Sequence, residues 1–167
     1  MSRGFVKEDD QEEVPMVPQR AHLPDGVTNF VTRTGMDLLL AEKEALTRER
    51  ESISITSENE KRIALNFINA KLQLLGNRIA EARVVDPKEQ PKGEIMFGAI
   101  VTLKTALSGK NQVFQIVGVD EADIARGKIS FLSPLAKALI NKKVGETITL
   151  KRDREEIAYE IMDISYR

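Results

Sequence analysis

Two apolar repeats constrain the fold of this chain more than any other feature of its sequence. In residues 36–53 and again in residues 65–82, seam positions are spaced alternately three and four residues apart, as in a coiled coil. The two seams consist of Met36, Leu39, Lys43, Leu46, Arg50 and Ile53, and of Leu65, Ile68, Leu72, Leu75, Ile79 and Ala82. Because only a short stretch, residues 52–56, separates the repeats, the sequence predicts an antiparallel pair of helices over residues 32–86.

Hydroxyl residues precede both predicted helices. Thr34 is the expected N-cap of the first helix, with Asp37 in the capping-box position three residues later. Ser57 is the expected N-cap of the second, and the early carboxylates of Glu58 and Glu60 suit the positive end of a helix. We therefore expect the second helix to begin directly after Ser57.

The outer faces of this helical hairpin allow two interpretations. The hairpin either docks as a small subdomain on a larger core or projects as an arm into solvent or into a partner. Its apolar stripes are narrow, and the nine basic side chains of residues 32–86 are matched by nine acidic ones. Polar outer faces of this kind favour the projecting arm.

The first 31 residues differ in composition from the rest. They hold three of the six prolines and little apolar periodicity, together with the acidic run Glu8, Asp9, Asp10, Glu12 and Glu13. Such a segment buries too little apolar surface to offset its ordering entropy, so residues 1–31 are predicted to be a flexible acidic extension. The alternative is an acidic docking arm. A lone histidine in such a segment, here His22, is more often inert than a ligand.

The remainder of the chain predicts a linker over residues 87–94 and a globular domain over residues 95–167. Ser133 is the expected N-cap of one short helix, with Pro134 at its first position. Short strands are predicted on both sides of it, at residues 98–104, 113–119, 128–132, 147–152 and 157–165. The predicted fold class is α+β: a two-helix coiled coil followed by a mostly antiparallel sheet with one covering helix.

Composition excludes several classes of function. With 25 Lys and Arg against 26 Asp and Glu, the chain is a poor candidate for nonspecific binding of duplex DNA. It has no cysteine and one histidine, which excludes thiolate zinc sites and multi-histidine metal sites. The absence of tryptophan and the 5% aromatic content disfavour a base-stacking platform for single-stranded nucleic acid.

An autonomous enzyme and a membrane protein are also disfavoured. The sequence offers no nucleophile paired with a general base and no phosphate-binding glycine loop. The acidic residues Asp120, Glu121 and Asp123 are expected to form a solvated turn. No apolar run approaches the ~20 residues that cross a bilayer, and the first residues lack the apolar stretch of a secretory signal. The expected compartment is the cytoplasm.

Four short phrases follow one another in the second half of the chain: FGAIV at residues 97–101, FQIVGVDE at 114–121, SPLAKAL at 133–139 and KVGE at 143–146. Nearer the front, VTRTG at 31–35 and VVD at 84–86 flank the predicted hairpin. With these residues the segment 31–167 resembles the bacterial Gre transcription elongation factors, of the GreA and GreB type.

The resemblance implies an FKBP-like C-terminal domain and a partner, RNA polymerase. In this family the globular domain docks at the rim of the secondary channel of the polymerase, and the coiled-coil arm enters the channel. The residues expected to dock are Leu132, Ser133, Pro134, Leu135 and Lys137. The alternative for this stretch is a helix cap followed by leucines that face the core. The resemblance implies contact with nucleic acid only within the transcription complex.

In the family, acidic residues at the tip of the arm hold a second Mg²⁺ in the polymerase active centre. That ion helps to activate the water that cleaves backtracked RNA, as in other two-metal sites. The polymerase performs the chemistry, so the resemblance implies an accessory factor with no cofactor of its own.

The tip of this chain departs from the family pattern. The family places an Asp three residues before a Glu-Asn pair, which stands here as Glu58 and Asn59 after Ser57. The Asp position holds Ile55, whose side chain has no oxygen with which to bind Mg²⁺. Glu58 is the remaining candidate ligand, and Glu60 lies roughly 200° further around the helix. The first helix, ~26 Å long, also falls about two to three turns short of typical members.

Three hypotheses follow. The leading one is a Gre-like factor that binds RNA polymerase at the secondary channel and regulates elongation by occupying the channel or by competing with cleavage factors. The second is stimulation of transcript cleavage through Glu58. The third is a binding module for a partner other than polymerase.

Overall fold

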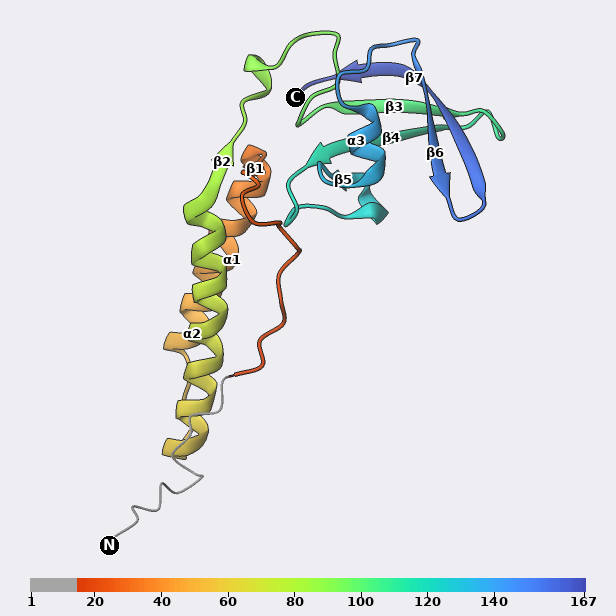
Figure 1. Ribbon diagram of the computed structural model, residues 1–167. Coiled ribbons are helices and arrows are strands. Elements are labelled where there is room, and N and C mark those ends of the chain that lie inside the picture. The colour runs from red at the N-terminus through yellow and green to blue at the C-terminus, as the bar shows by residue number, and fades with distance from the viewer. Residues whose placement is uncertain (1–14) are drawn as a thin grey trace, which may run out of the picture.

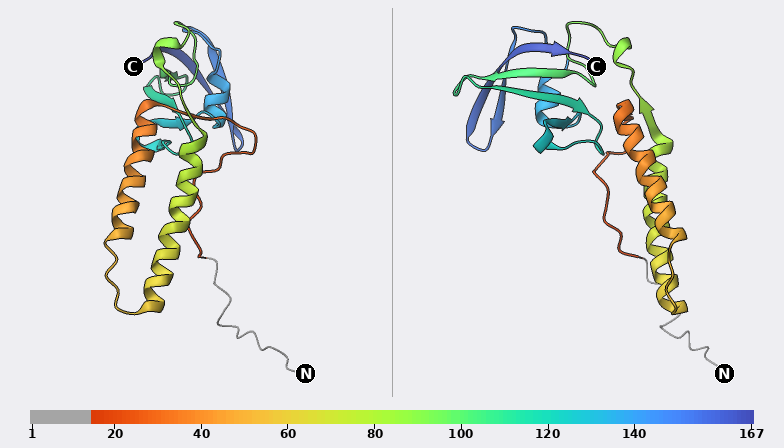
Figure 2. Two further views of the ribbon diagram at one scale, coloured as in Figure 1. Left: turned by 90° about the vertical axis from the view of Figure 1, so that its left-hand side faces the viewer. Right: turned by 180° about the vertical axis from the view of Figure 1, so that it is seen from behind.

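A computed structural model of the chain describes residues 15–167, and the acidic run at residues 8–13 lies outside the described residues. Two long helices form an arm that projects from a small domain containing most of the strands (Figure 1). Two further views agree that the turn between the helices lies at the end of the arm away from that domain (Figure 2). Within residues 15–167, no helix combines the length and apolar character that crossing a membrane requires.

The arm consists of helix α1, Arg33–Glu51, and helix α2, Glu58–Glu81. The predicted seams form their contact, since Leu39, Ile68 and Leu75 are buried between them. The two charged seam positions, Lys43 and Arg50, are exposed. Apolar burial therefore holds the helix pair together mainly on the side nearer the domain.

One of the two predicted N-caps is confirmed and the other is wrong. The Ser57 hydroxyl accepts a hydrogen bond from the Glu60 backbone N–H at 3.4 Å, as expected for the start of α2. Helix α1 begins two residues earlier than predicted, because Thr32 rather than Thr34 is the N-cap. The Thr32 hydroxyl accepts the Gly35 N–H at 2.9 Å, while its own backbone is extended and continues the preceding strand.

Two short strands close the base of the arm. Strand β1, Asn29–Val31, pairs in parallel with strand β2, Ala82–Val84. The prediction of a flexible extension through residue 31 is therefore wrong for residues 29–31, where Asn29 and Val31 are buried. A strand of three residues leaves no periodic pattern in the sequence, which is why composition alone misassigned it.

The C-terminal domain is a five-stranded sheet with strand order β5-β4-β3-β7-β6. All five predicted strands are confirmed, and so is the α+β fold class. The sheet is not wholly antiparallel, because β4 and β5 run in parallel. The strands are β3 Ile100–Thr105, β4 Asn111–Val117, β5 Lys128–Ser130, β6 Thr147–Arg152 and β7 Glu155–Ser165.

One short helix, α3 (Pro134–Leu139), packs on one face of this sheet (Figure 1). Its Leu139 side chain is fully buried with side chains of the facing strands, among them Leu103, Ile116 and Ile161. Burial of each such side chain contributes roughly 1.5–3 kcal/mol, so this layer is the main source of stability in the domain.

The segment that joins arm and domain is held by hydrogen bonds. It contains a 3₁₀ turn, Pro87–Glu89, capped by Asp86. The Gln90 side chain donates to the Phe97 carbonyl at 3.0 Å, and the Tyr166 hydroxyl accepts the Met96 N–H at 2.9 Å. Tyr166, which directly follows β7, thereby anchors the entry into the domain.

Candidate functional site

The tip of the arm is the first candidate site. The turn between the helices presents Ile55, a residue that is 38% exposed, followed by the capping residue Ser57. Glu58 and Glu60 occupy the first turn of α2, where both are exposed. Their carboxylates complement the positive end of the helix.

The charge at the tip is mixed rather than acidic. Asn59 accepts a hydrogen bond from Arg62 at 3.0 Å, and Arg50 of α1 donates to Asn69 of α2 at 3.3 Å. A shallow groove near the tip is lined by Glu58, Asn59, Lys61, Arg62, Leu65, Asn66 and Asn69. Within residues 15–167, no three His, Asp or Glu side chains gather closely enough to hold a metal ion.

The predicted docking residues lie at the start of α3. Ser133 is its N-cap, with its hydroxyl accepting the Ala136 N–H at 3.3 Å, and Leu135 packs against the core. Leu132 is half-buried and its N–H is bonded to the Ser130 hydroxyl. Pro134 and Lys137 are exposed. Of the five residues, these two present a free surface, whereas Ser133 and Leu135 have structural roles.

A third candidate site lies where the arm meets the domain, and it was not predicted from the sequence. Asp120 and Glu121, which follow β4, do not form the solvated turn that was predicted. The Asp120 carboxylate is 9% exposed and pairs with Arg20 at 3.1 Å, and that of Glu121 is 2% exposed and pairs with Lys128 at 3.1 Å. Asp123 is exposed and caps a short 3₁₀ turn, so it alone meets the expectation.

The arm contributes directly to this cluster. The Thr32 hydroxyl donates to the Glu121 carboxylate, and Arg20 also binds Glu42 of α1 with two hydrogen bonds, of 2.7 and 3.0 Å. Hydrogen bonding to Glu42 raises the pKa of Arg20 above its ordinary value, against the opposing effect of burial. The guanidinium therefore carries its charge at every physiological pH.

An aromatic cluster completes the joint between arm and domain. Phe30 of β1 lies against Phe97 and Phe131 of the domain, with ring centroids 5.8 Å away in each case. Phe97 and Phe131 meet edge to face at 5.6 Å. Such contacts contribute about 0.5–1.5 kcal/mol each beyond apolar burial. Polar and apolar contacts thus both connect the arm to the sheet domain.

Comparison with known proteins bears on the domain at this joint. Residues 90–166 match the family described as "Transcription elongation factor, GreA/GreB, C-term". The C-terminal part of the chain is therefore similar to the GreA/GreB family. The matched segment contains the start of α3 together with Asp120 and Glu121, and the arm tip precedes it.

Curated relatives and solved structures of this family are also similar to the chain. The GreA of Thermodesulfovibrio yellowstonii is 41% identical over 101 residues, or 60% of this chain and 64% of the relative. The GreA of Alkalilimnicola ehrlichii is 39% identical over 102 residues, or 60% of this chain and 65% of the relative. The matches thus span just under two thirds of each relative.

Among solved structures, GreA/GreB from Nitrosomonas europaea is 20% identical, with a TM-score of 0.42 over 82% of this chain and 98% of that one. Gfh1 of Thermus thermophilus is 22% identical, with a TM-score of 0.39 over 83% of this chain and 99% of that one.

Proposed function

We propose that this chain, whose C-terminal part matches the GreA/GreB family, binds RNA polymerase at its secondary channel and regulates elongation by occupying the channel. The observation that carries the proposal is a helical arm that projects from a GreA/GreB domain and ends in exposed Ile55. The arm supplies the shape for entering a channel. The polymerase, and not this chain, would perform any cleavage of RNA, in the cytoplasm where transcription takes place.

The side chains at the tip support occupancy over supply of a metal ion. A second Mg²⁺ shared with the polymerase needs oxygen ligands, and Ile55 offers none. Glu58 is a single carboxylate at the start of α2, and its neighbours Lys61 and Arg62 repel a cation. The tip therefore does not fit a Mg²⁺ held between two carboxylates.

Docking would use the exposed surface at the start of α3. Pro134 is a rigid apolar contact and Lys137 a positive one, and both residues are exposed. Ser133 fixes their geometry by capping the helix. A docking role therefore rests on Pro134 and Lys137, with Ser133 as a positioning residue.

A stalled, backtracked elongation complex tests the proposal. The wild-type chain, added with Mg²⁺, should bind the complex without shortening the RNA faster than polymerase alone. It should also slow cleavage that a Gre factor with an acidic tip stimulates. Acceleration of cleavage by the wild-type chain would contradict occupancy, and absence of binding to core polymerase would favour a different protein partner.

The alternative, cleavage stimulated through Glu58, is supported by the position of that carboxylate at the tip. It predicts that the wild-type chain shortens the RNA, that Glu58→Ala abolishes the effect, and that Glu60→Ala leaves it in place. A gain-of-function pair completes the test. Ile55→Asp adds the missing carboxylate, while Ile55→Asn adds a side chain of equal size without the charge, so only the former should confer cleavage activity if charge is what the tip lacks.

A further inference from the structure

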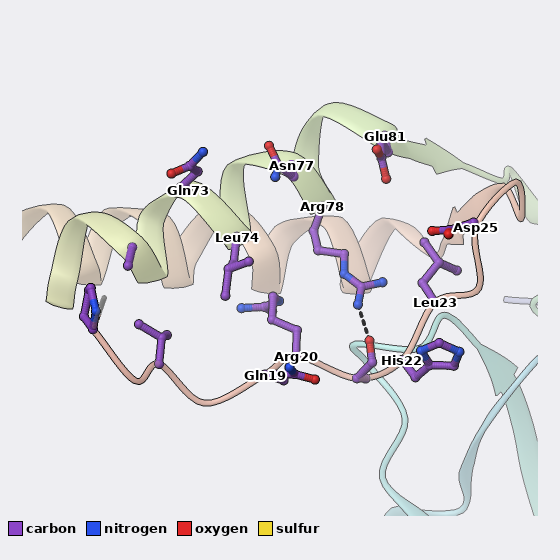
Figure 3. Close-up of a pocket in the computed structure, with 14 residues that line it drawn as sticks. Gln19, Arg20, His22, Leu23, Asp25, Gln73, Leu74, Asn77, Arg78 and Glu81 are labelled. Atoms are coloured by element: carbon purple, nitrogen blue, oxygen red, sulfur yellow. Dashed lines mark hydrogen bonds between the residues drawn. The ribbon is translucent and has the colours of Figure 1, made fainter. Parts of the chain in front are cut away.

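The segment of residues 15–25, here called the N-terminal brace, lies in the angle between the arm and the C-terminal domain (Figure 2). It runs alongside α2, from which Leu74 and Arg78 point toward it (Figure 3). On another side, the brace borders a groove that is lined by residues of α1, α2 and the turn after β4, including Glu42, Lys71 and Asp120. The brace therefore contacts three parts of the molecule that are separate in sequence.

Arg20 is the residue through which the brace joins arm and domain. Its guanidinium bonds Glu42 of α1 through Nη1 and Nη2, and Asp120 of the domain through Nε. The Arg20 side chain is 19% exposed and that of Asp120 is 9% exposed, so the ionic contact to the domain is shielded from solvent. A planar guanidinium that binds two carboxylates on different elements restrains the distance between them.

Helix α2 adds to the same contact. Arg78 donates to the Ala21 carbonyl of the brace, and its Nε lies 3.7 Å from Asp120 Oδ2. Within the described residues, Asp120 Oδ2 and Arg78 Nη1 have no hydrogen-bond partner. Two buried polar atoms at the joint between arm and domain thus lack a hydrogen bond even with the brace in place. Without Arg20, the buried Asp120 carboxylate would retain only the longer contact to Arg78.

The position of Glu42 makes this contact effective against rotation. The arm meets the domain at Thr32 and Glu121, where α1 begins. Glu42 lies ten residues further along α1, about 15 Å from that point at the helical rise per residue. A restraint at the pivot fixes position, whereas one applied away from it resists a change of angle.

We propose that the N-terminal brace fixes the angle between the arm and the C-terminal domain, with Arg20 as the residue that carries the restraint. The consequence for polymerase rests on the function proposed above, since the angle decides whether arm and domain engage one channel together. The brace itself is a property of the free protein. Its test therefore needs no polymerase.

Because the sequence has no cysteine, spin labels attach only at cysteines that are introduced for a distance measurement. Lys61→Cys near the tip and Lys110→Cys in the domain place spin labels at two exposed positions for pulsed electron paramagnetic resonance. In this background, Arg20→Gln should raise the population of other arm orientations by roughly tenfold, seen as a second or broadened distance distribution. Arg48→Gln is the matched control, since it removes the same charge from an exposed pair with Glu44 within α1 and should leave the distribution unchanged.

Folding is monitored by circular dichroism on the same samples. A folded Arg20→Gln protein with the wild-type distance distribution would overturn the proposal. Should Arg20→Gln fail to fold, Glu42→Gln provides the milder variant, because the Glu42 side chain is 43% exposed and its loss leaves the Arg20 contact to Asp120 in place. A wild-type distribution in folded Glu42→Gln would equally overturn it.

Polymerase binding is measured separately on the unlabelled chains. If Arg20→Gln releases the arm and also weakens binding to core polymerase, both the brace and its proposed use are supported. If the arm is released while the wild-type chain does not bind polymerase, the brace stands and the proposed function fails.

Discussion

The hydroxyl of Thr32 donates to the buried carboxylate of Glu121 and at the same time accepts the Gly35 N–H that begins α1. One side chain therefore both caps the first helix of the arm and bonds that helix to the C-terminal domain. Glu121 also accepts a hydrogen bond from Lys128, so its carboxylate is held on two sides. The start of the arm is consequently determined by a residue 89 positions away in sequence.

Gly35→Ala should destabilise the protein, although the same change within a helix usually stabilises by about 0.5–1 kcal/mol. A Cβ at Gly35 would lie 2.6 Å from Glu121 Oε1, and that carboxylate cannot move freely because Thr32 and Lys128 hold it. We expect a loss of about 1–3 kcal/mol, measured by urea denaturation. Gly76→Ala in α2 is the matched control, since a Cβ there meets nothing within 4 Å, and it should stabilise. Equal stabilisation by both changes would contradict the contact.

Substitutions at the start of α3 should separate stability from docking. Ser133→Ala should lower the free energy of unfolding by about 1 kcal/mol, because the Ala136 N–H loses its cap. Lys137→Ala should leave stability within about 0.5 kcal/mol of wild type and weaken binding to polymerase, in line with the proposed function. Chemical denaturation and a binding titration read out the two effects. Unchanged affinity of Lys137→Ala would remove this residue from the docking surface.

Phe30→Leu should destabilise the joint by about 1–2 kcal/mol, since it removes two aromatic contacts while keeping most of the apolar volume. Phe67→Leu in α2 is the control, because Phe67 contacts Lys71 of its own helix. Thermal unfolding followed by circular dichroism gives the comparison. Equal effects at the two positions would mean that the aromatic cluster adds nothing beyond burial.

Alkaline pH should weaken the anchor formed by Tyr166. Burial raises the pKa of this phenol above its ordinary value of about 10, and the Glu94 charge adds to the shift while the hydrogen bond from Met96 opposes it. Since the pKa is higher in the folded state, this shift contributes to the free energy of unfolding. The contribution is fully present below pH ~10 and is lost as the pH rises through the raised pKa. Tyr166→Phe should cost about 1 kcal/mol at neutral pH and lose less stability above pH ~10 than wild type. Tyr159→Phe, at the only other tyrosine of the chain, is the control.

The elements that follow from local sequence patterns were predicted well. The 3-4 spacing of residues such as Leu39, Leu75 and Ile79 indicates two helices, and alternation such as Ile157, Tyr159 and Ile161 indicates a strand, because burial of one face imposes these periods. The start of the first helix was harder to predict, because two similar residues could each cap it. Thr32 and Thr34 are equivalent as caps in sequence, and only the short strand before Thr32 decides between them.

The joint between arm and domain was not predictable in this way. Arg20 and Asp120 lie 100 positions apart, and nothing in the residues around either one indicates a partner. The acidic run of Asp120 and Glu121 is typical of a solvated turn, and its burial results from side chains that other elements bring to it. Ile55 at the tip was identified in another way. It is a single residue in a short turn, and the resemblance to the family showed that it occupies the position of the expected Asp.

The pairing of β1 with β2 has a consequence for how such chains can vary. Because Val31 and Val84 are joined at the base, the two helices behave as an insertion whose outer end is independent of the domain that carries it. Adding or removing one heptad from each helix would change the reach by about 10 Å while keeping the same seam in contact. Depth of penetration into a partner is therefore a property that can be adjusted in steps, with the domain and its joint left unaltered.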